Sequence, residues 1–254
     1  MKRFIIYTVL LVVSLGVASA AEPTAMERWD AGNRAYIEGN YEGAIEEYQS
    51  IVDGGEYSAE LYYNLANAYF KVGNVGKAIL YYHKVMRVDP SHEDTLHNLA
   101  IAEAQTKDKV AEEPEFFLNS WMLSMRNLMS CTAWSVLSLV ALGVLIAFVL
   151  IFLLASRIVL RKTGFFGAIC ALVLFISTTA FAISSRNDML QHDEAIVMAS
   201  AISVKSSPDN SATDLFVLHE GAKVRLLSEV DEWCEVALAD GKKGWTQKSN
   251  VEQI

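Results

Sequence analysis

The chain has 254 residues, of which 52% are hydrophobic, and its formal net charge is −9. An apolar fraction this high is unusual for one water-soluble domain, so the apolar residues must be concentrated in particular segments. The negative charge argues against nucleic acid as a partner.

The first 20 residues have the pattern of a secretory signal peptide. Two basic residues precede an apolar run from Phe4 to Val17, and Ala18-Ser19-Ala20 is a small-x-small cleavage site. We therefore predict a signal peptide over 1–20 and a mature chain that starts near Ala21. An uncleaved membrane anchor is the alternative. In either case the following region is exported.

Residues 25–58 and 59–92 are two copies of one pattern in a register of 34 residues. Gly39, Ala44 and Tyr48 of the first copy recur as Gly73, Ala78 and Tyr82 of the second. This period resembles the tetratricopeptide repeat (TPR) family, in which pairs of helices stack and leave a concave surface that holds another protein. We predict a TPR domain over 21–112, in which a third, incomplete copy forms a capping helix over 93–107.

Small and large residues alternate between the predicted helices as the TPR resemblance requires. Gly32 and Ala66 hold the small position of each first helix, and small residues in the second helices face large ones, which allows close approach. Gly39 and Gly73 fall where a left-handed turn is expected. The first repeat departs from the family at Ala35, which replaces an aromatic residue, and it lacks a closing proline.

The TPR resemblance also implies a protein-binding groove lined by the first helix of each repeat. Two of its places hold asparagine, which the family often uses to grip the backbone of a ligand. Neighbouring places are aromatic instead of basic, which favours an apolar segment over a free carboxylate. Alternatively, the aromatic residues pack on the third helix or against the bilayer. The predicted groove residues are Trp29, Asn33, Tyr36, Tyr63, Asn67, Phe70, Lys71, His97 and Ile101.

Two uncharged runs after Arg126 each exceed the ~20 residues that cross a bilayer. We predict transmembrane helices over 134–154 and 165–183. The loop between them, 155–163, is basic, so the positive-inside rule places it in the cytoplasm and both flanking domains outside. Residues 116–132 have apolar side chains at helical spacing. They either form an interfacial helix along the outer leaflet or extend the first span.

From residue 194 onward the pattern changes to short strands, which predict a small barrel with a hairpin at Asp240-Gly241. The predicted strands are 197–204, 215–218, 223–230, 232–239 and 243–247. Segments around Val204, Gly221, Trp233 and Trp245 resemble the bacterial SH3 family, so we expect an SH3-like domain over 194–254. Family members bind cell-wall peptides or mediate envelope contacts. Trp233 and Trp245 would then form the ligand surface, unless they pack the barrel.

The sequence contains no recognisable catalytic, cofactor-binding or metal-binding pattern. Three scattered cysteines have no CxxC spacing, and we interpret them as packing residues. Among the histidines, His92 is expected to cap a turn and His97 to lie on a helix, which does not suggest a metal site with His83. We therefore expect no cofactor and no enzyme. A redox protein would need an exposed thiol of low pKa, which nothing here indicates.

The predicted fold class is a multidomain membrane protein with an all-α TPR solenoid, two transmembrane helices and a small all-β SH3-like barrel. This order resembles the BatE-type proteins of the Bacteroides aerotolerance (Bat) operon. The resemblance implies a scaffold of the bacterial inner membrane, with periplasmic domains, in an envelope stress or aerotolerance complex. Its partners would include membrane proteins with von Willebrand factor A domains. The alternative is a peptidoglycan-binding tether or cell-wall sensor.

Overall fold

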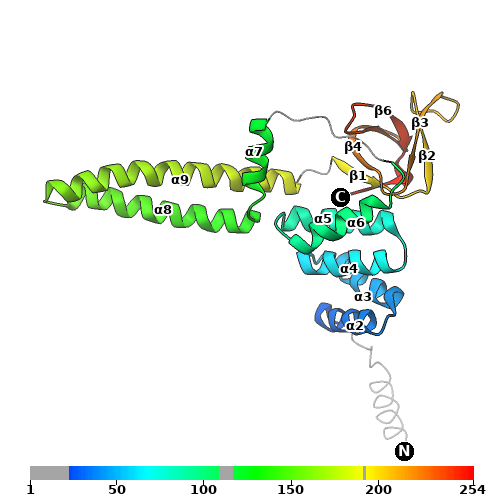
Figure 1. Ribbon diagram of the computed structural model, residues 1–254, viewed down its shortest axis with the longest axis horizontal. Helices are drawn as coiled ribbons and strands as arrows, with labels where there is room; N and C mark the ends of the chain where they lie inside the picture. Colours follow the sequence, from blue (N-terminus) through cyan, green and yellow to red (C-terminus); the bar gives the residue numbers. More distant parts are fainter. Residues whose placement is uncertain (1–22, 109–116, 191–192) are drawn as a thin grey trace, which may run out of the picture.

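The computed structural model describes residues 23–108, 117–190 and 193–254. The predicted signal peptide over 1–20 lies outside the described residues. The described chain forms a stack of helices, a long helical hairpin and a β domain (Figure 1). The hairpin projects away from the other two parts, and the β domain lies against the upper end of the stack (Figure 1).

The stack contains α2 (Ala25–Ile37), α3 (Tyr41–Asp53), α4 (Ala59–Lys71), α5 (Val75–Val88) and α6 (Glu93–Ala104). Every one of these helices begins at a side chain that accepts a hydrogen bond from the backbone three residues later, which satisfies a free N–H of the first turn. The caps are Thr24, Asn40, Ser58, Asn74 and His92. The expectation that His92 caps a turn is confirmed. The capping helix predicted over 93–107 ends at Ala104.

Close packing of small against large residues holds each helix pair together, as the sequence predicts. A Cβ placed on Gly32 would lie 2.6 Å from the ring of Tyr48, so only glycine fits there. Ala66 and Ala78 have no exposed surface in the second repeat. The turns use left-handed glycines, with φ of 80° at Gly39 and 82° at Gly73.

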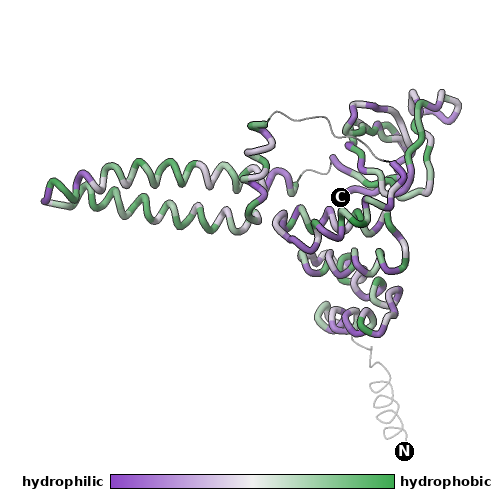
Figure 2. The backbone as a smooth tube through the Cα atoms, in the orientation of Figure 1, coloured by the Kyte–Doolittle hydropathy of each residue, from purple (hydrophilic) through white to green (hydrophobic). Residues whose placement is uncertain are grey.

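The hairpin consists of α8 (Cys131–Leu154) and α9 (Ile158–Leu190), which pack side by side. A Cβ on Gly164 would lie 2.6 Å from the backbone nitrogen of Phe152, so the helices approach closely. Ser138 and Thr179 share a hydrogen bond of 2.7 Å across the contact. Only 11% of the most apolar window of each helix is buried, and apolar residues cover most of the hairpin (Figure 2).

Both hairpin helices extend beyond the predicted spans 134–154 and 165–183. The predicted basic loop over 155–163 is correspondingly too long. The backbone N–H of Arg161 already donates to the Arg157 carbonyl at 3.1 Å, so Arg161 and Lys162 belong to the first turns of α9. Arginine and lysine have high helix propensity, so basic residues can lie within a helix. The position of the charged residues therefore did not reveal where α9 begins.

A short helix, α7 (Phe117–Arg126), crosses the hairpin at the end nearest the stack (Figure 1). A turn separates it from α8, which begins with its own N-cap residue, Ser130. Trp134 Nε1 donates to the Arg126 carbonyl at 2.8 Å, and the Arg126 guanidinium lies 3.3 Å from Asp188 of α9. These contacts fix α7 across the end of the hairpin.

The β domain is an antiparallel sheet with strand order β3-β2-β6-β5-β4-β1-β7. Its inner face buries a core around Val204, Val224 and Val236. The strands are β1 (Glu194–Val197), β2 (Ala201–Lys205), β3 (Asp214–His219), β4 (Lys223–Val230), β5 (Trp233–Ala237), β6 (Lys243–Gln247) and β7 (Val251–Gln253), with a 3-10 turn at Lys248–Asn250.

The single strand predicted over 197–204 is wrong, because it is split into the end of β1 and most of β2. The two have different partners: β1 pairs with β4 and β7, whereas β2 pairs with β3 and β6. The chain must therefore change position in the sheet between Val197 and Ala201. Strand β7 was not predicted. The hairpin turn at Asp240-Gly241 is confirmed, with φ of 82° at Gly241.

Candidate functional site

Trp29 and Tyr63, two aromatic residues of the predicted groove, are half-buried against the stack. The ring of Trp29 lies 5.6 Å from that of Tyr48, and the ring of Tyr63 lies 6.3 Å from that of Tyr82. Tyr63 also accepts a hydrogen bond from Asn98 at 3.1 Å. Both side chains therefore support the packing of the helices with one face and keep part of their surface open.

The two groove asparagines hold the helices to one another. Asn67 Oδ1 accepts hydrogen bonds from the hydroxyl of Tyr82 at 2.6 Å and from the amide of Asn98 at 3.0 Å. The same arrangement occurs 34 residues earlier. It joins Asn33, Tyr48 and Asn64 at 2.7 and 3.3 Å. The side-chain oxygens that the TPR resemblance assigns to a ligand are thus engaged within the stack.

The remaining groove residues differ in their exposure. Tyr36 and Phe70 are half-buried, whereas Lys71, His97 and Ile101 are exposed. Ile101 keeps 42% of its surface, which is high for an isoleucine on a packed helix. The exposed part of the groove therefore lies chiefly on α6 and at the end of α4.

The β domain docks on α5, the second helix of the second repeat. The backbone N–H of Gly76 donates to Glu220 Oε1 at 2.9 Å, and Arg87 donates to the Ile254 carbonyl at 2.7 Å. Ile196 and Ile254 belong to the same buried cluster as the repeat helices. The stack and the β domain therefore share a continuous apolar core.

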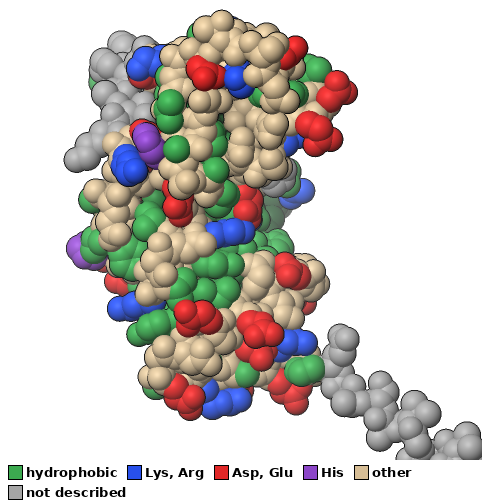
Figure 3. Space-filling view, turned by 90° about the vertical axis from the view of Figure 1, so that its right-hand side faces the viewer, with side chains coloured by type: hydrophobic (Ala, Val, Ile, Leu, Met, Phe, Trp, Pro, Cys, Tyr) green, Lys and Arg blue, Asp and Glu red, His purple; other side chains and the backbone are tan. Residues whose placement is uncertain are grey.

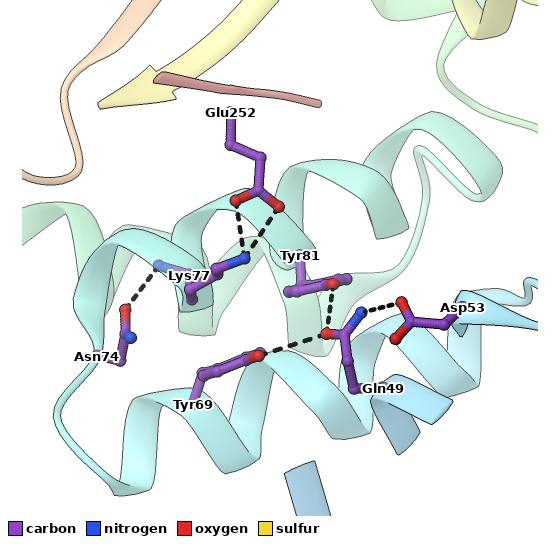
Figure 4. Close-up of polar contacts among 7 residues, drawn as sticks. All are labelled: Gln49, Asp53, Tyr69, Asn74, Lys77, Tyr81 and Glu252. Carbon is purple, nitrogen blue, oxygen red and sulfur yellow. Dashed lines mark hydrogen bonds and ion pairs between the residues drawn. The ribbon is translucent and has the colours of Figure 1, made fainter. Parts of the chain in front are cut away.

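Two further polar contacts reinforce this interface. Lys77 Nζ reaches both carboxylate oxygens of Glu252 on β7, at 2.7 and 3.0 Å (Figure 4). Asp108, just after α6, binds both the backbone N–H and Nδ1 of His219. The domain is consequently held both by α5 and by the segment that follows α6.

A network of hydrogen bonds connects α5, the helix that carries Lys77, to the first repeat. Gln49 Oε1 accepts hydrogen bonds from Tyr81 at 2.7 Å and Tyr69 at 3.3 Å, and its amide donates to Asp53 at 2.9 Å (Figure 4). Helices α3, α4 and α5 thus meet at one side chain. Burial raises the pKa of Tyr81, which therefore remains a neutral hydroxyl donor.

Sequence reasoning missed this docking site, although a comparison of the two repeats carries the signal. At the same register, α3 has exposed Glu42 and Glu46 where α5 has buried Gly76 and Leu80. A helix that is apolar on every side must be covered on every side. The composition of α5 therefore indicates a second packing partner.

Acidic side chains are exposed on the face of the stack that is turned away from the hairpin (Figure 3). Figure 3 shows them spread over its lower part, with hydrophobic side chains gathered in the middle. Glu42, Glu46, Asp53, Glu56 and Glu60 are all exposed.

On the β domain, Trp233 and Trp245 lie on the outward face of β5 and β6. Their neighbours in the same strands, Cys234 and Thr246, are buried on the opposite face. Both tryptophans are partly exposed and neither belongs to the buried core cluster. They are diagonal neighbours across the ladder, since Trp245 pairs with Glu235.

The three cysteines are free: Cys131 is half-buried, Cys170 exposed and Cys234 buried. Burial raises the pKa of the Cys234 thiol, the opposite of what a reactive thiol needs. Within residues 23–108, 117–190 and 193–254, no three His, Cys, Asp or Glu side chains are grouped so that they could hold a metal ion.

Comparisons with known proteins identify two interaction domains. A search of curated proteins finds no match. Residues 59–92 match the sequence profile of the tetratricopeptide repeat, and residues 200–252 match that of the bacterial SH3 domain. Both matches coincide with parts of the structure described above, the α4–α5 pair and the sheet from β2 to β7. The chain therefore contains a tetratricopeptide repeat and a bacterial SH3 domain, both of which are non-catalytic interaction modules.

Proposed function

We propose that this protein is a scaffold of the bacterial inner membrane whose TPR and SH3 domains bind other envelope proteins from the extracytoplasmic side. The observation that carries the proposal is the docking of the SH3 domain on α5. It joins both interaction domains through one apolar core, while exposed residues of the groove remain on α4 and α6. Two binding surfaces are thereby presented in a constant geometry.

The hairpin supports the membrane part of the proposal. Helices α8 and α9 are each long enough to cross a bilayer and leave most of their apolar surface exposed, unlike core helices of soluble proteins. The basic residues Arg157, Arg161 and Lys162 lie at the tip far from the stack, which the positive-inside rule assigns to the cytoplasm.

Helix α7 supports the same orientation. It lies across the hairpin, and its exposed apolar side chains include Trp121, with 57% of its surface free. Tryptophan favours the boundary between lipid and water. We therefore place α7 in the outer interface of the membrane, directly beneath the stack and the SH3 domain.

The groove is proposed to take an apolar segment of a neighbouring membrane protein. Trp29 and Tyr63 offer partly open aromatic faces, and Ile101 offers an exposed aliphatic surface. Aromatic residues commonly provide much of the binding energy of an interface. The resemblance to BatE-type proteins suggests a partner with a von Willebrand factor A domain, and a role in aerotolerance or envelope stress.

The test is partner recovery by full-length protein solubilised from native membranes. Ile101→Glu places a charge in the groove at an exposed position, so folding should persist while recovery falls about tenfold. The matched control is Ile37→Glu, at an isoleucine that is 84% exposed and is not a groove residue. Equal recovery by both variants would remove the groove from the proposal.

A second candidate function is a tether to peptidoglycan, and the outward position of Trp233 and Trp245 favours it. Partly open aromatic rings can stack on sugar or peptide groups of the cell wall. Full-length protein should then sediment with isolated peptidoglycan, and Trp245→Ala should reduce the bound fraction severalfold. Sedimentation that is independent of Trp245, or absent, would leave the scaffold as the better explanation.

A further inference from the structure

Helix α6 opens a third repeat that the described part of the chain does not complete. The 34-residue register aligns α6 with α2 and α4, the first helices of the two complete repeats. A second helix packs against each of these, α3 against α2 and α5 against α4. Within residues 23–108, 117–190 and 193–254, the next helix after α6 is α7, which lies across the hairpin (Figure 1). The face of α6 that a second helix would cover is therefore left open.

The small residue of each first helix marks the face that its second helix covers. A Cβ on Gly32 of α2 would lie 2.6 Å from the Tyr48 ring of α3, and Ala66 of α4 has no exposed surface. One period later the small residue is Ala100, which is exposed. Ala100 therefore lies where the first repeat accommodates a large side chain of the covering helix.

Leu96 extends this open face by one helical turn towards the start of α6. Its counterpart in α4, Tyr62, places its ring 5.9 Å from that of Tyr81 on α5. Leu96 retains 50% of its surface. Residues four apart in a helix are neighbours on one side of it, so Leu96 and Ala100 form a continuous apolar strip. We call this strip the open face of α6.

The open face is distinct from the groove. The groove residues of α6, His97 and Ile101, each follow a residue of the open face by one position. They therefore point about 100° further around the helix. A ligand can occupy one of the two surfaces without contacting the other.

Acidic residues border the open face. Glu93 and Glu103 lie three residues before Leu96 and three after Ala100, and α6 contains no lysine or arginine. Both are exposed, although Glu103 lies 3.6 Å from Nε2 of His83. A covering helix with basic residues is therefore favoured. A second copy is not, because two α6 helices packed antiparallel would bring these carboxylates together.

The sequence after α6 does not repeat the packing pattern of a second helix. The small residues of α3 and α5 are Ala44 and Ala78, and the same register next falls on Glu112. A carboxylate does not suit a place that is buried in both complete repeats. We therefore expect the covering helix to come from another molecule.

We propose that the open face of α6 binds a basic amphipathic helix of another protein, which packs as the second helix of the third repeat. That helix places a large apolar side chain over Ala100 and a lysine or arginine beside Glu93 or Glu103. Helix α5 is a model for it within this chain, because it covers α4 and has three basic residues and no acidic one. The proposal adds a docking surface to the scaffold and depends neither on the groove nor on the membrane placement.

The probes are two peptides copied from the chain itself. One has the basic sequence of α5, Val75–Val88, and the other has the sequence of α3, Tyr41–Asp53, with four acidic residues and no basic one. Each labelled peptide is titrated with full-length protein in dodecyl maltoside, and binding is measured by fluorescence anisotropy. We expect the α5 peptide to bind about tenfold more tightly than the α3 peptide, with an affinity that decreases as salt is added.

Two variants alter the open face at exposed positions, so folding should persist. Leu96→Lys removes an apolar contact and repels a basic helix, whereas Ala100→Trp fills the small position. Each should weaken binding of the α5 peptide about tenfold. Ile37→Lys is the matched control, because it makes the same change of charge at an isoleucine that is 84% exposed on α2, at the other end of the stack (Figure 1).

Thermal unfolding of each variant verifies that the stack is intact. Selective binding of the α5 peptide that is lost in Leu96→Lys and Ala100→Trp, and kept in Ile37→Lys, supports the site. Equal binding of the two peptides, equal binding by wild type and both variants, or no binding of the α5 peptide overturns the proposal. A dimer in analytical ultracentrifugation that Ala100→Trp dissociates also overturns it, because a second copy then covers the open face.

Discussion

Two buried tyrosines, Tyr48 and Tyr82, each place a hydroxyl against an asparagine of the preceding helix. Burial raises the pKa of Tyr48 to about 12, so its hydroxyl stays protonated and must donate. A buried hydroxyl without an acceptor costs roughly 1–3 kcal/mol. Asn33 and Asn67 are therefore required by the fold itself, whatever the groove binds.

Replacing Asn67 by alanine is expected to lower the free energy of unfolding by about 1–3 kcal/mol, because Tyr82 and Asn98 both lose their acceptor. Adding Tyr82→Phe should recover part of this loss, since no unsatisfied hydroxyl remains. The measurement is urea unfolding of the full-length protein in detergent. An Asn67→Ala variant as stable as wild type would contradict the structural role.

His83 predicts a pH dependence of stability. Burial is the main cause that lowers its pKa below the ordinary 6.5, with Lys223 acting in the same direction and Glu103 and Glu194 against it. Just below pH 6.5, His83 of the unfolded chain binds a proton, whereas His83 of the folded protein stays neutral until a lower pH. The contribution of His83 is therefore fully present above about pH 6.5 and is lost as the pH falls towards its folded pKa.

The unfolding midpoint should accordingly decrease between about pH 7 and about pH 5.5, and His83→Phe should flatten that decrease. His97→Phe, at an exposed histidine on α6, is the control for removing an imidazole. If both variants keep the wild-type pH profile, the buried imidazole is not the group responsible.

Among the elements, α5 has the most constrained position, because it packs on α4 and α6 and also carries the SH3 domain. Its first turn allows this contact through Gly76. A Cβ at that position would lie 2.8 Å from Cγ of Glu220. The exposed Glu42 at the same register of α3 shows that the repeat itself accepts a glutamate there.

Gly76→Glu is therefore expected to separate the SH3 domain from the stack without unfolding α5. Glutamate favours a helix over glycine by somewhat less than ~1 kcal/mol, and its charge suits the first turn. It would nevertheless crowd and repel Glu220. Hydrogen exchange of the full-length protein should show faster exchange in β1 and β7, while α2 and α3 are unchanged. Glu42→Gly is the reciprocal control, and unaltered protection of β1 and β7 in Gly76→Glu would contradict the docking.

At the scale of the whole molecule, three parts converge at one end of the hairpin. Arg126 joins α7 to α9 through Asp188, and Arg87 joins α5 to the SH3 domain through Glu194 and Ile254. Both interaction domains therefore lie at the same end of α8 and α9, opposite the basic tip. With α8 and α9 crossing the membrane as proposed, this arrangement places both domains on the same side of it.

Protease added to spheroplasts should accordingly digest both the TPR and the SH3 regions. The basic tip at 155–157 should be cleaved only after the membrane is permeabilised. Immunoblots against each region provide the measurement. Survival of either domain in intact spheroplasts would exclude the proposed topology.

Local patterns were sufficient for the helices of the stack, the hairpin and four of the strands among the described residues. The 34-residue period located α2 to α6, and the packing of Gly32 against Tyr48 follows from small and large residues at fixed spacing. The uncharged runs located the hairpin, and turn residues located most strands. These features depend on interactions between residues close in sequence, or on side-chain chemistry alone, so periodicity and composition record them.

What only the tertiary structure decided involves residues far apart in the chain. The partners of Asn67 and the contact of Gly76 with Glu220 both depend on where separate elements meet. The split between β1 and β2 has the same origin, because each strand follows its partners and not its own composition. The sequence by itself determined a helical repeat, an apolar hairpin and a small β domain. Their assembly around α5 was decided by contacts between elements, because the buried surface that joins them exists only once all are packed.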